Sequence, residues 1–316
     1  KDKKMYDIII VGAGTAGLSA GIYAVRAGKT ALILEASAYG GQIINTPDIE
    51  NYPGIAHISG FEFATGLYNQ AKDLGAEIKF ENVLSIEEKA APGSDDFKGS
   101  IKLITTSSNV YEAKAVILAT GAKNRHLNIE NEDELVGKGI SYCAICDGMF
   151  FRNQAVAVNG GGNTAMEDAK FLSNYCSKVY LIHRRDAFRA DEKEVERLRQ
   201  KQNVEFVLNS TVTKLNSDET GLKSIEITDT FTGYVRTLEV SGLFVAIGQA
   251  PDNQSFSNLV SLDEKGYIKA DESCITDTSG IFTAGDCRTK AVRQLATAAS
   301  DGAVAALAAA SYIDSF

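Results

Sequence analysis

The residues best suited to chemistry in this chain are two cysteines, Cys143 and Cys146, which are separated by two residues. Two thiols at that spacing can close into a disulfide and reopen. Residues 139–142 lead into an expected helix, and the free backbone N–H groups and dipole of a first helical turn lower the pKa of a cysteine there. Asp147 follows directly, and its carboxylate can pass a proton to and from a leaving thiolate. We therefore expect redox chemistry with Cys143, Cys146 and Asp147 as the catalytic residues.

Two different interpretations of the cysteine pair are less well supported. A zinc site needs a second pair of Cys or His residues at ligand spacing, and the sequence offers none, so we expect no metal. Two packed structural cysteines are the second interpretation, and the neighbouring carboxylate disfavours it. An intracellular C-x-x-C pair next to strand and helix patterns usually takes part in disulfide exchange.

The composition is that of a globular protein with more than one domain. Its 316 residues suggest two domains, and 44% hydrophobic with 23% charged residues is ordinary for such a chain. The net charge of -9 argues against nucleic acid or an anionic membrane as a partner. An expected strand at 6–11 leaves no room for a signal peptide, and no apolar run is long enough to span a membrane. With only one close pair among five cysteines, we expect a cytoplasmic protein.

A glycine-rich turn follows that first expected strand. The turn has the pattern G-x-G-x-x-G, a helix is expected after it, and the next strand ends in Glu35. The glycines let backbone N–H groups approach a pyrophosphate at the helix N-terminus, and the acidic residue can accept hydrogen bonds from an adenosine ribose. A glycine turn without a ligand is the alternative, but the surrounding pattern favours a dinucleotide site. The three glycines are Gly12, Gly14 and Gly17.

The same pattern returns half a chain later. A strand at 154–158 precedes a G-x-G-x-x-A turn with Gly160 and Gly162, and a helix at 164–173 and a strand at 178–182 follow. This internal repeat predicts a second dinucleotide fold. The fold class is therefore α/β.

The two copies differ at the end of the second strand. Where the first copy has Glu35, the second has His183, Arg184 and Arg185, with Arg189 just beyond. Guanidinium groups suit a 2′-phosphate, so we expect FAD at the first site and NADPH at the second. A solvated basic patch is the alternative, because several nearby acidic residues could pair with the arginines. These are Asp186, Asp191, Glu192, Glu194 and Glu196.

Further elements follow from hydrophobic periodicity and turn residues. Expected helices lie at 61–74, 193–202 and 293–310, and expected strands at 77–89, 100–106, 113–119, 204–208, 211–215, 224–229 and 243–247.

Taken together, these motifs resemble the low-molecular-weight thioredoxin reductases over essentially the whole chain. The matching stretches are GAGTAG at 12–17, GGQ at 40–42, ENYPG at 50–54, ATGA at 119–122, CAICDG at 143–148, GGGNTA at 160–165, HRRDAFR at 183–189, GIFTAGD at 280–286 and RQLATAASDG at 293–302. The resemblance implies two Rossmann-like domains of the three-layer ββα type and a homodimer. An FAD domain formed by 1–121 and 248–316 would contain an inserted NADPH domain, 122–247, that carries the dithiol.

The resemblance also implies a role for each matching residue. Cys146 would face the flavin, Cys143 would exchange with thioredoxin, and Asp147 would act as the acid. The residues expected to bind FAD are Gly12, Gly14, Thr15, Ala16, Gly17, Glu35, Ala36, Gly40, Gly41, Gln42, Asn51, Val83, Thr120, Gly121, Gly285, Asp286, Arg293, Gln294, Leu295 and Ala296. Those expected to bind NADPH are Gly160, Gly162, Asn163, Thr164, His183, Arg184, Arg185 and Arg189.

The implied activity is NADPH-dependent thioredoxin reduction through FAD and the Cys143–Cys146 disulfide. Dithiol and nicotinamide must take turns at one flavin, so we expect the inserted domain to rotate, with Gly121 and Gly248 as hinges. Asn159, where the family has an aliphatic residue, leaves open a reductase that takes electrons from ferredoxin or another flavoprotein. The flavoprotein half of a peroxide-reducing system and a flavin-bound redox sensor are two further candidate functions.

Overall fold

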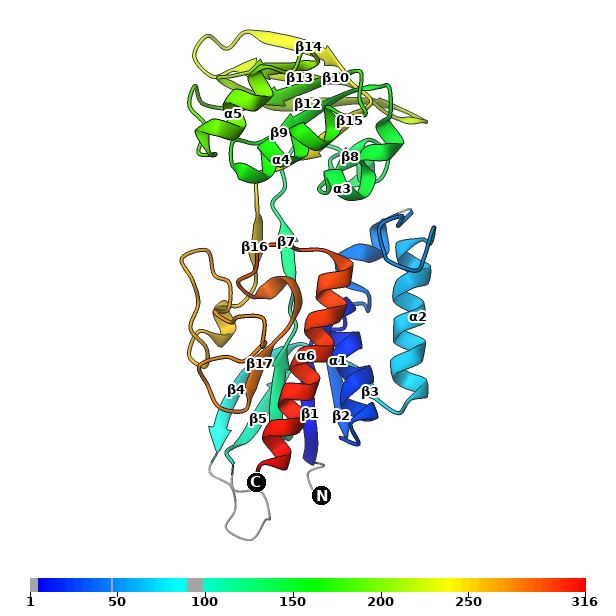
Figure 1. Cartoon of the computed structure of the whole chain (residues 1–316), viewed down its shortest axis with the longest axis vertical. Coiled ribbons are helices and arrows are strands. Elements are labelled where there is room, and N and C mark those ends of the chain that lie inside the picture. The colour runs from blue at the N-terminus through cyan, green and yellow to red at the C-terminus, as the bar shows by residue number, and fades with distance from the viewer. Residues whose placement is uncertain (1–4, 47, 90–98) are drawn as a thin grey trace. The chain divides into compact units, whose positions relative to one another are not determined.

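Parallel sheets covered by helices dominate the computed structural model, which describes residues 5–46, 48–89 and 99–316 (Figure 1). The chain divides into two units. The first joins residues 1–123 to 250–316, and the second comprises residues 124–249. The first segment of the first unit ends at residue 123, where the sequence suggested 121. The second unit ends at residue 249, where the sequence suggested 247.

The first unit is built on a sheet with the strand order β3-β2-β1-β6-β5-β4, and β17 also pairs with β6. Strands β1, β2, β3, β6 and β17 run parallel, while β4 and β5 add an antiparallel edge. The bounds are β1 (Met5–Val11), α1 (Thr15–Arg26), β2 (Ala31–Glu35), α2 (Gly60–Asp73), β3 (Glu77–Phe80), β4 (Val83–Lys89), β5 (Ile101–Thr106), β6 (Val110–Leu118), β17 (Ile281–Thr283) and α6 (Leu295–Asp314). Short 3-10 helices cover Gly41–Asn45, Gln254–Phe256 and Gly285–Cys287.

The run of isoleucines in β1 explains why this strand lies at the centre of the sheet. Ile8, Ile9 and Ile10 are all 0% exposed, although successive side chains point to opposite faces. Ile8 and Ile10 belong to one apolar cluster and Ile9 to another. A parallel strand buried on both faces requires such a continuous apolar run.

The alanine-rich helix α6 packs closely beside α1 (Figure 1). The Ser19 hydroxyl on α1 donates a hydrogen bond to the Ala299 carbonyl at 2.7 Å. A Cβ atom on Gly302 would lie 2.2 Å from the carbonyl oxygen of Ala16, so only glycine fits there. Small residues on α6 thus bring its N-terminus close to the glycine turn that begins α1.

The second unit contains a parallel sheet with the order β11-β10-β9-β15-β8 and an antiparallel sheet β12-β13-β14. Helices α4 and α5 pack on the parallel sheet. The bounds are β8 (Ile140–Ser141), α3 (Ala144–Asp147), β9 (Ala155–Asn159), α4 (Asn163–Leu172), β10 (Lys178–Ile182), α5 (Glu192–Arg199), β11 (Val204–Val207), β12 (Ser210–Asp218), β13 (Gly221–Asp229), β14 (Val235–Glu239) and β15 (Gly242–Val245). Short 3-10 helices cover Asp133–Leu135 and Gly148–Phe151.

Two short strands carry the chain between the units. They are β7 (Ala122–Asn124) and β16 (Gln249–Pro251), which pair with each other. Gly121 and Gly248 precede them with φ of +70° and +103°. A Cβ atom on either glycine would meet nothing within 4 Å, so their backbones are not confined by packing.

One prediction about the strands was wrong. The single strand expected at 77–89 is two strands, β3 and β4, at opposite ends of the sheet order. The Glu81 carboxylate fixes the break, because it accepts hydrogen bonds from Thr106 at 2.6 Å and from Tyr111 at 2.8 Å. Strand β14 was not predicted.

In the described part of the chain, no helix is both long and apolar enough to cross a bilayer.

Candidate functional site

The cysteine pair forms a disulfide at the start of α3, with 5.3 Å between the two Cα atoms. Cys143 is the N-cap residue, and its Sγ accepts a hydrogen bond from the backbone N–H of Cys146 at 3.3 Å. One backbone N–H of the first helical turn therefore points at the sulfur. Such donors stabilise the negative charge that Cys143 carries when the disulfide opens. The structure thus holds the oxidised form of a dithiol that can be reduced again.

Asp147 lies at the end of the same short helix. Its Oδ2 accepts a hydrogen bond from the Ser141 hydroxyl at 2.6 Å, and its Oδ1 is buried without a partner among the described residues. Burial raises the pKa of Asp147, although the Ser141 hydrogen bond acts in the opposite direction. A carboxyl group with a raised pKa holds its proton more readily than an exposed one and can still release it.

The other three cysteines have little access to solvent. Cys176, Cys274 and Cys287 are free thiols and all are buried. Burial raises the pKa of Cys176 to about 11 and that of Cys274 to about 12, so both remain protonated thiols. Cys287 is 0% exposed, like a small core hydrophobe. The reactive pair is therefore Cys143 and Cys146.

The first glycine turn connects β1 to α1 in the first unit. Gly12 has φ of +108°, and a Cβ atom on it would lie 2.3 Å from the Ala119 carbonyl oxygen. A Cβ atom on Gly17 would lie 1.8 Å from the carbonyl oxygen of Gly12, whereas one on Gly14 meets nothing within 4 Å. The outer two glycines therefore serve chain packing, and Gly14 presents bare backbone to open space. Such backbone is where a pyrophosphate is bound in dinucleotide folds.

Other residues expected to bind FAD surround this turn. Gly40 forms a β-bridge with Gly14, and a Cβ atom on Gly41 would lie 3.5 Å from the Gly14 Cα. The Asn51 amide donates a hydrogen bond to the Gln294 side chain at 3.2 Å. Gly40 and Gly41 therefore lie beside the glycine turn, and Asn51 lies beside Gln294 at the N-terminus of α6.

Glu35 stands at the end of β2, as predicted. Its Oε2 accepts a hydrogen bond from the Ala13 backbone N–H at 2.7 Å, and its Oε1 accepts one from Ser37 at 3.1 Å. These bonds fix the carboxylate beside the glycine turn. The adjacent Ala36 is exposed.

Two orphaned polar atoms test whether a flavin nucleotide fits this site. Asp286 Oδ1 and Arg293 Nε are buried, and within the described residues neither has a hydrogen-bond partner. The first atom can accept a hydrogen bond from a hydroxyl, and the second can donate one to an anionic oxygen. The ribityl chain and pyrophosphate of FAD carry such groups, so the residues present fit that cofactor. Burial also raises the pKa of Asp286.

The remaining residues of the FAD prediction lie around the same turn or in the core. The Thr120 hydroxyl donates to the Asn253 side chain at 2.8 Å, and Asn253 donates to the Cys287 carbonyl at 2.9 Å. Val83 is buried at the start of β4 in the same apolar cluster as Val11. The others are Thr15 and Ala16 at the start of α1, Gln42 in the 3-10 helix Gly41–Asn45, Gly285 before Asp286, and Leu295 and Ala296 at the start of α6.

The second glycine turn connects β9 to α4 in the second unit. A Cβ atom on Gly160 would lie 2.3 Å from the Ala246 carbonyl oxygen, but one on Gly162 meets nothing within 4 Å. Gly161 packs on the ring of His183, where a Cβ atom would lie 2.1 Å away. His183 is only 6% exposed, and burial lowers its pKa. The His183 ring therefore packs against the glycine turn and supports its backbone.

The arginine cluster lies next to this second turn. The Arg189 backbone N–H donates to the Gly161 carbonyl at 2.8 Å, and the Asn163 side chain accepts from the Asp191 N–H at 3.0 Å. Both bonds hold the segment after β10 against the glycines. Thr164 follows Asn163 in the first turn of α4.

The guanidinium groups of this cluster are available to a ligand. Arg184, Arg185 and Arg189 are exposed, and within the described residues no carboxylate lies at ion-pair distance from them. Glu194, a candidate partner in the sequence, instead pairs with Lys170 and Arg197. The alternative of a self-neutralised basic patch loses its main support. A 2′-phosphate on a bound nucleotide suits the three free cations.

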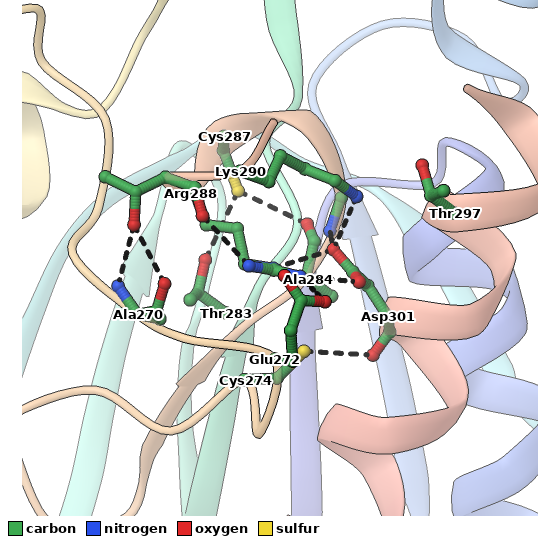
Figure 2. A network of polar contacts seen from close by, with 12 residues as sticks. Ala270, Glu272, Cys274, Thr283, Ala284, Cys287, Arg288, Lys290, Thr297 and Asp301 are labelled. Carbon is green, nitrogen blue, oxygen red and sulfur yellow. Dashed lines mark hydrogen bonds and ion pairs between the residues drawn. The ribbon is translucent and has the colours of Figure 1, made fainter. Parts of the chain in front are cut away.

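A buried ionic network that no sequence pattern indicated lies next to the turn at Gly285 (Figure 2). The Asp301 carboxylate on α6 accepts hydrogen bonds from the Gly285 N–H at 3.0 Å, from Arg288 at 2.8 Å and from Lys290 at 2.9 Å. Arg288 also pairs with Glu272 at 2.9 Å and is 0% exposed. Burial alone would raise the pKa of Asp301, but the two cations hold it below its usual range. The network fixes the backbone turn that carries Asp286.

Replacing Asp301 with asparagine should destabilise the first unit by about 3 kcal/mol, because it leaves two buried cations undercompensated. Urea unfolding monitored by circular dichroism measures this change. Asp314→Asn is the matched control, since its pair with Lys29 lies at the surface and should contribute under about 1 kcal/mol. Equal stability of the Asp301→Asn variant and the wild type would contradict this account of the network.

A group of residues with metal-ligating side chains lies in the loop between the 3-10 helix Gly41–Asn45 and α2. Asp48, Glu50 and His57 have their ligand atoms within 4.8 Å of one another. Hydrogen bonding to Asp48, at 2.9 Å from His57 Nδ1, raises the pKa of that histidine. The contacts of His57 Nδ1 with Asp48 at 2.9 Å and with Glu50 at 3.5 Å hold these three side chains together.

The chain is similar to known proteins over nearly its whole length. The family model described as "Pyridine nucleotide-disulphide oxidoreductase" matches residues 6–303. Thioredoxin reductase of Treponema pallidum is 44% identical over 98% of this chain and 97% of its own length, and that of Listeria innocua is 38% identical over 99% and 95%. The crystal structure of thioredoxin reductase from Streptococcus pyogenes is 38% identical, covers 100% of both chains and superposes with a TM-score of 0.92.

Proposed function

The chain belongs to the pyridine nucleotide-disulphide oxidoreductase family, and on that premise we propose how its two units carry out thioredoxin reduction. The first unit holds FAD and the second holds NADPH together with the dithiol. When bound, these cofactors supply a hydride and carry its electron pair to the disulfide. The substrate is the disulfide of thioredoxin.

The observation that carries the proposal is the oxidised Cys143–Cys146 pair, with Asp147 and the free arginines in the same unit. Two electrons and one proton convert this disulfide into one thiol and one thiolate. The Cys143 thiolate then attacks the disulfide of thioredoxin, forming a mixed disulfide, and Cys146 resolves it. Thioredoxin leaves as a dithiol, and the Cys143–Cys146 bond forms again. Asp147 donates the proton when the Cys143–Cys146 bond opens and takes up a proton when that bond forms again.

Steady-state turnover with different electron donors tests this function. We expect the FAD-loaded enzyme to reduce thioredoxin with NADPH alone. Reduced ferredoxin is the comparison, because Asn159 at the end of β9 departs from the family pattern. Turnover that requires ferredoxin would contradict NADPH as donor. Flavin reduction without any thioredoxin reduction would instead favour a redox sensor.

Alternation between the two partners of the flavin is part of the proposal. Dithiol and nicotinamide belong to one unit, so that unit must turn about β7 and β16 to present each in succession. The open surroundings of Gly121 and Gly248 support hinges at these positions.

A covalent cross-link between the two units should therefore preserve one half-reaction and stop turnover. Stopped-flow absorbance of the flavin measures reduction by NADPH, and thioredoxin turnover is assayed on the same sample. A cross-link confined to one unit is the control and should leave both rates unchanged. Full turnover in enzyme locked between its units would refute the alternation.

Assembly and location follow the family. We propose a homodimer, which light scattering of the purified holoenzyme would test. We also place the protein in the cytoplasm. Three free thiols and a dithiol that must be reduced in each cycle suit a reducing compartment.

A further inference from the structure

The Ser141 hydroxyl lies between the backbone of the dithiol and the Asp147 carboxylate. Ser141 ends β8 and is 3% exposed. Its Oγ accepts a hydrogen bond from the Cys143 N–H at 3.1 Å and donates one to Asp147 Oδ2 at 2.6 Å. The Cys143 carbonyl is a competing acceptor at 3.3 Å. A hydroxyl has only one proton, and the shorter contact with a carboxylate takes it.

We propose that Ser141 is a positioning residue that holds the Asp147 carboxylate beside the dithiol and sets how readily it gives up its proton. The inference rests on the proposed function, because it concerns the acid of the same site. The Cys143 N–H fixes the orientation of the hydroxyl from one side, so its proton points toward the carboxylate on the other. Asp147 thereby keeps a fixed place relative to the chain segment that carries both sulfurs.

Proton balance gives Ser141 a defined part in the reaction. The electron pair that breaks the Cys143–Cys146 bond leaves two thiolates, and the carboxylic acid of Asp147 transfers one proton to one of them. The resulting carboxylate is buried, and the Ser141 O–H stabilises it. When exchange with thioredoxin reforms the Cys143–Cys146 bond, the carboxylate takes up a proton again. Without the hydroxyl, the carboxylate form would be costly and Asp147 would hold its proton more tightly.

Among the described residues, the Ser141 hydroxyl is the group that lowers the pKa of Asp147. Burial raises the pKa of Asp147 and the Ser141 hydrogen bond lowers it, and no charged group adds to these two causes. Glu132 is occupied, because it accepts a hydrogen bond from the Tyr142 phenol at 2.9 Å. Helix α4 packs on α3 and carries the titratable groups Glu167, Asp168 and Lys170, and the segment that precedes α3 in the chain carries His126, Glu132, Asp133 and Tyr142.

The experiment measures the titration of Asp147 directly in the oxidised holoenzyme. Aspartate labelled with 13C at the carboxyl carbon gives a resonance whose shift follows protonation, and Asp147→Asn assigns the signal. In Ser141→Ala the pKa of Asp147 should rise by about one pH unit, the effect of losing one hydrogen bond to a charged group. Ser141→Thr keeps the hydroxyl and should titrate like the wild type. Ser224→Ala, which removes another buried serine of the same unit, is the matched control.

The outcomes separate this inference from the proposed function. An Asp147 titration that is unchanged in Ser141→Ala overturns the role of Ser141, whether or not the wild type reduces thioredoxin. If alanine destabilises the fold, Ser141→Gly provides the same comparison. A rise in the pKa of Asp147 together with an inactive wild type would support the role of Ser141 and refute thioredoxin reduction. A rise in both Ser141→Ala and Ser224→Ala would overturn the inference, because the effect would not depend on the hydroxyl.

Discussion

Replacing either Cys143 or Cys146 with serine lowers NADPH-driven thioredoxin reduction by more than about a hundredfold, because a single sulfur cannot complete the exchange. The pair forms one bond at the start of α3, and the other cysteines are buried. No third thiol is therefore placed to replace a missing one. Steady-state reduction of thioredoxin, followed by the appearance of its free thiols, measures the loss.

The two serine variants should fail in different ways. If Cys143 is the attacking thiol, Cys146→Ser should trap a mixed disulfide with thioredoxin, which non-reducing electrophoresis detects. Cys143→Ser should trap none. Cys287→Ser is the matched control, because Cys287 is buried in the first unit and should leave the rate within about twofold of the wild type. A mixed disulfide trapped by Cys143→Ser instead would show that Cys146 attacks thioredoxin and Cys143 resolves the mixed disulfide.

Removing the arginine cluster produces the second large effect. In Arg184→Ala/Arg185→Ala, kcat/KM for NADPH should fall by about a hundredfold, since each lost charge-assisted contact with the 2′-phosphate costs roughly tenfold. The value for NADH should stay within about threefold, because NADH lacks that phosphate. Initial rates with each nucleotide at fixed thioredoxin give both numbers.

Arg197→Ala is the control for the loss of positive charge. Arg197 is exposed on α5 and pairs with Glu194, so its removal changes the net charge without touching the cluster. A similar decline with NADH and NADPH in the double variant would show that the arginines serve the fold and do not select the nucleotide.

The glycine turns were predictable because their chemistry is local. Gly12 and Gly17 are required by contacts within a few residues or with the adjacent strand end, so a strand, a glycine pattern and a helix suffice to identify them. The same holds for Glu35, which the end of β2 carries to the turn. The dithiol was also predictable, since its spacing fixes its chemistry.

The residues that hold the sites were not predictable because their partners are distant in sequence. Asp301 bonds to Gly285 and Arg288 across a loop, and only the packing of α6 brings them together. A carboxylate in the middle of an alanine-rich helix was the available signal, because a buried charge needs a partner. Ser141 gave no such signal, since a serine before C-x-x-C is unremarkable until Asp147 is placed beside it.

The prediction of a single strand at 77–89 was wrong for a related reason. Both segments have strand-like composition, and the turn between them contains neither glycine nor proline. The side-chain bonds of Glu81 to Thr106 and Tyr111 make that turn, and the partners lie at least 25 residues away. Local patterns cannot report such contacts.

Single-turnover transfer tests the central claim most directly. Enzyme loaded with FAD is reduced anaerobically with one equivalent of NADPH and then mixed with oxidised thioredoxin in a rapid-quench device. The account predicts one thioredoxin dithiol for each NADPH oxidised, and none from the Cys143→Ser/Cys146→Ser variant. Thioredoxin reduction that persists in that double variant would contradict the claim that this sulfur pair carries the electrons.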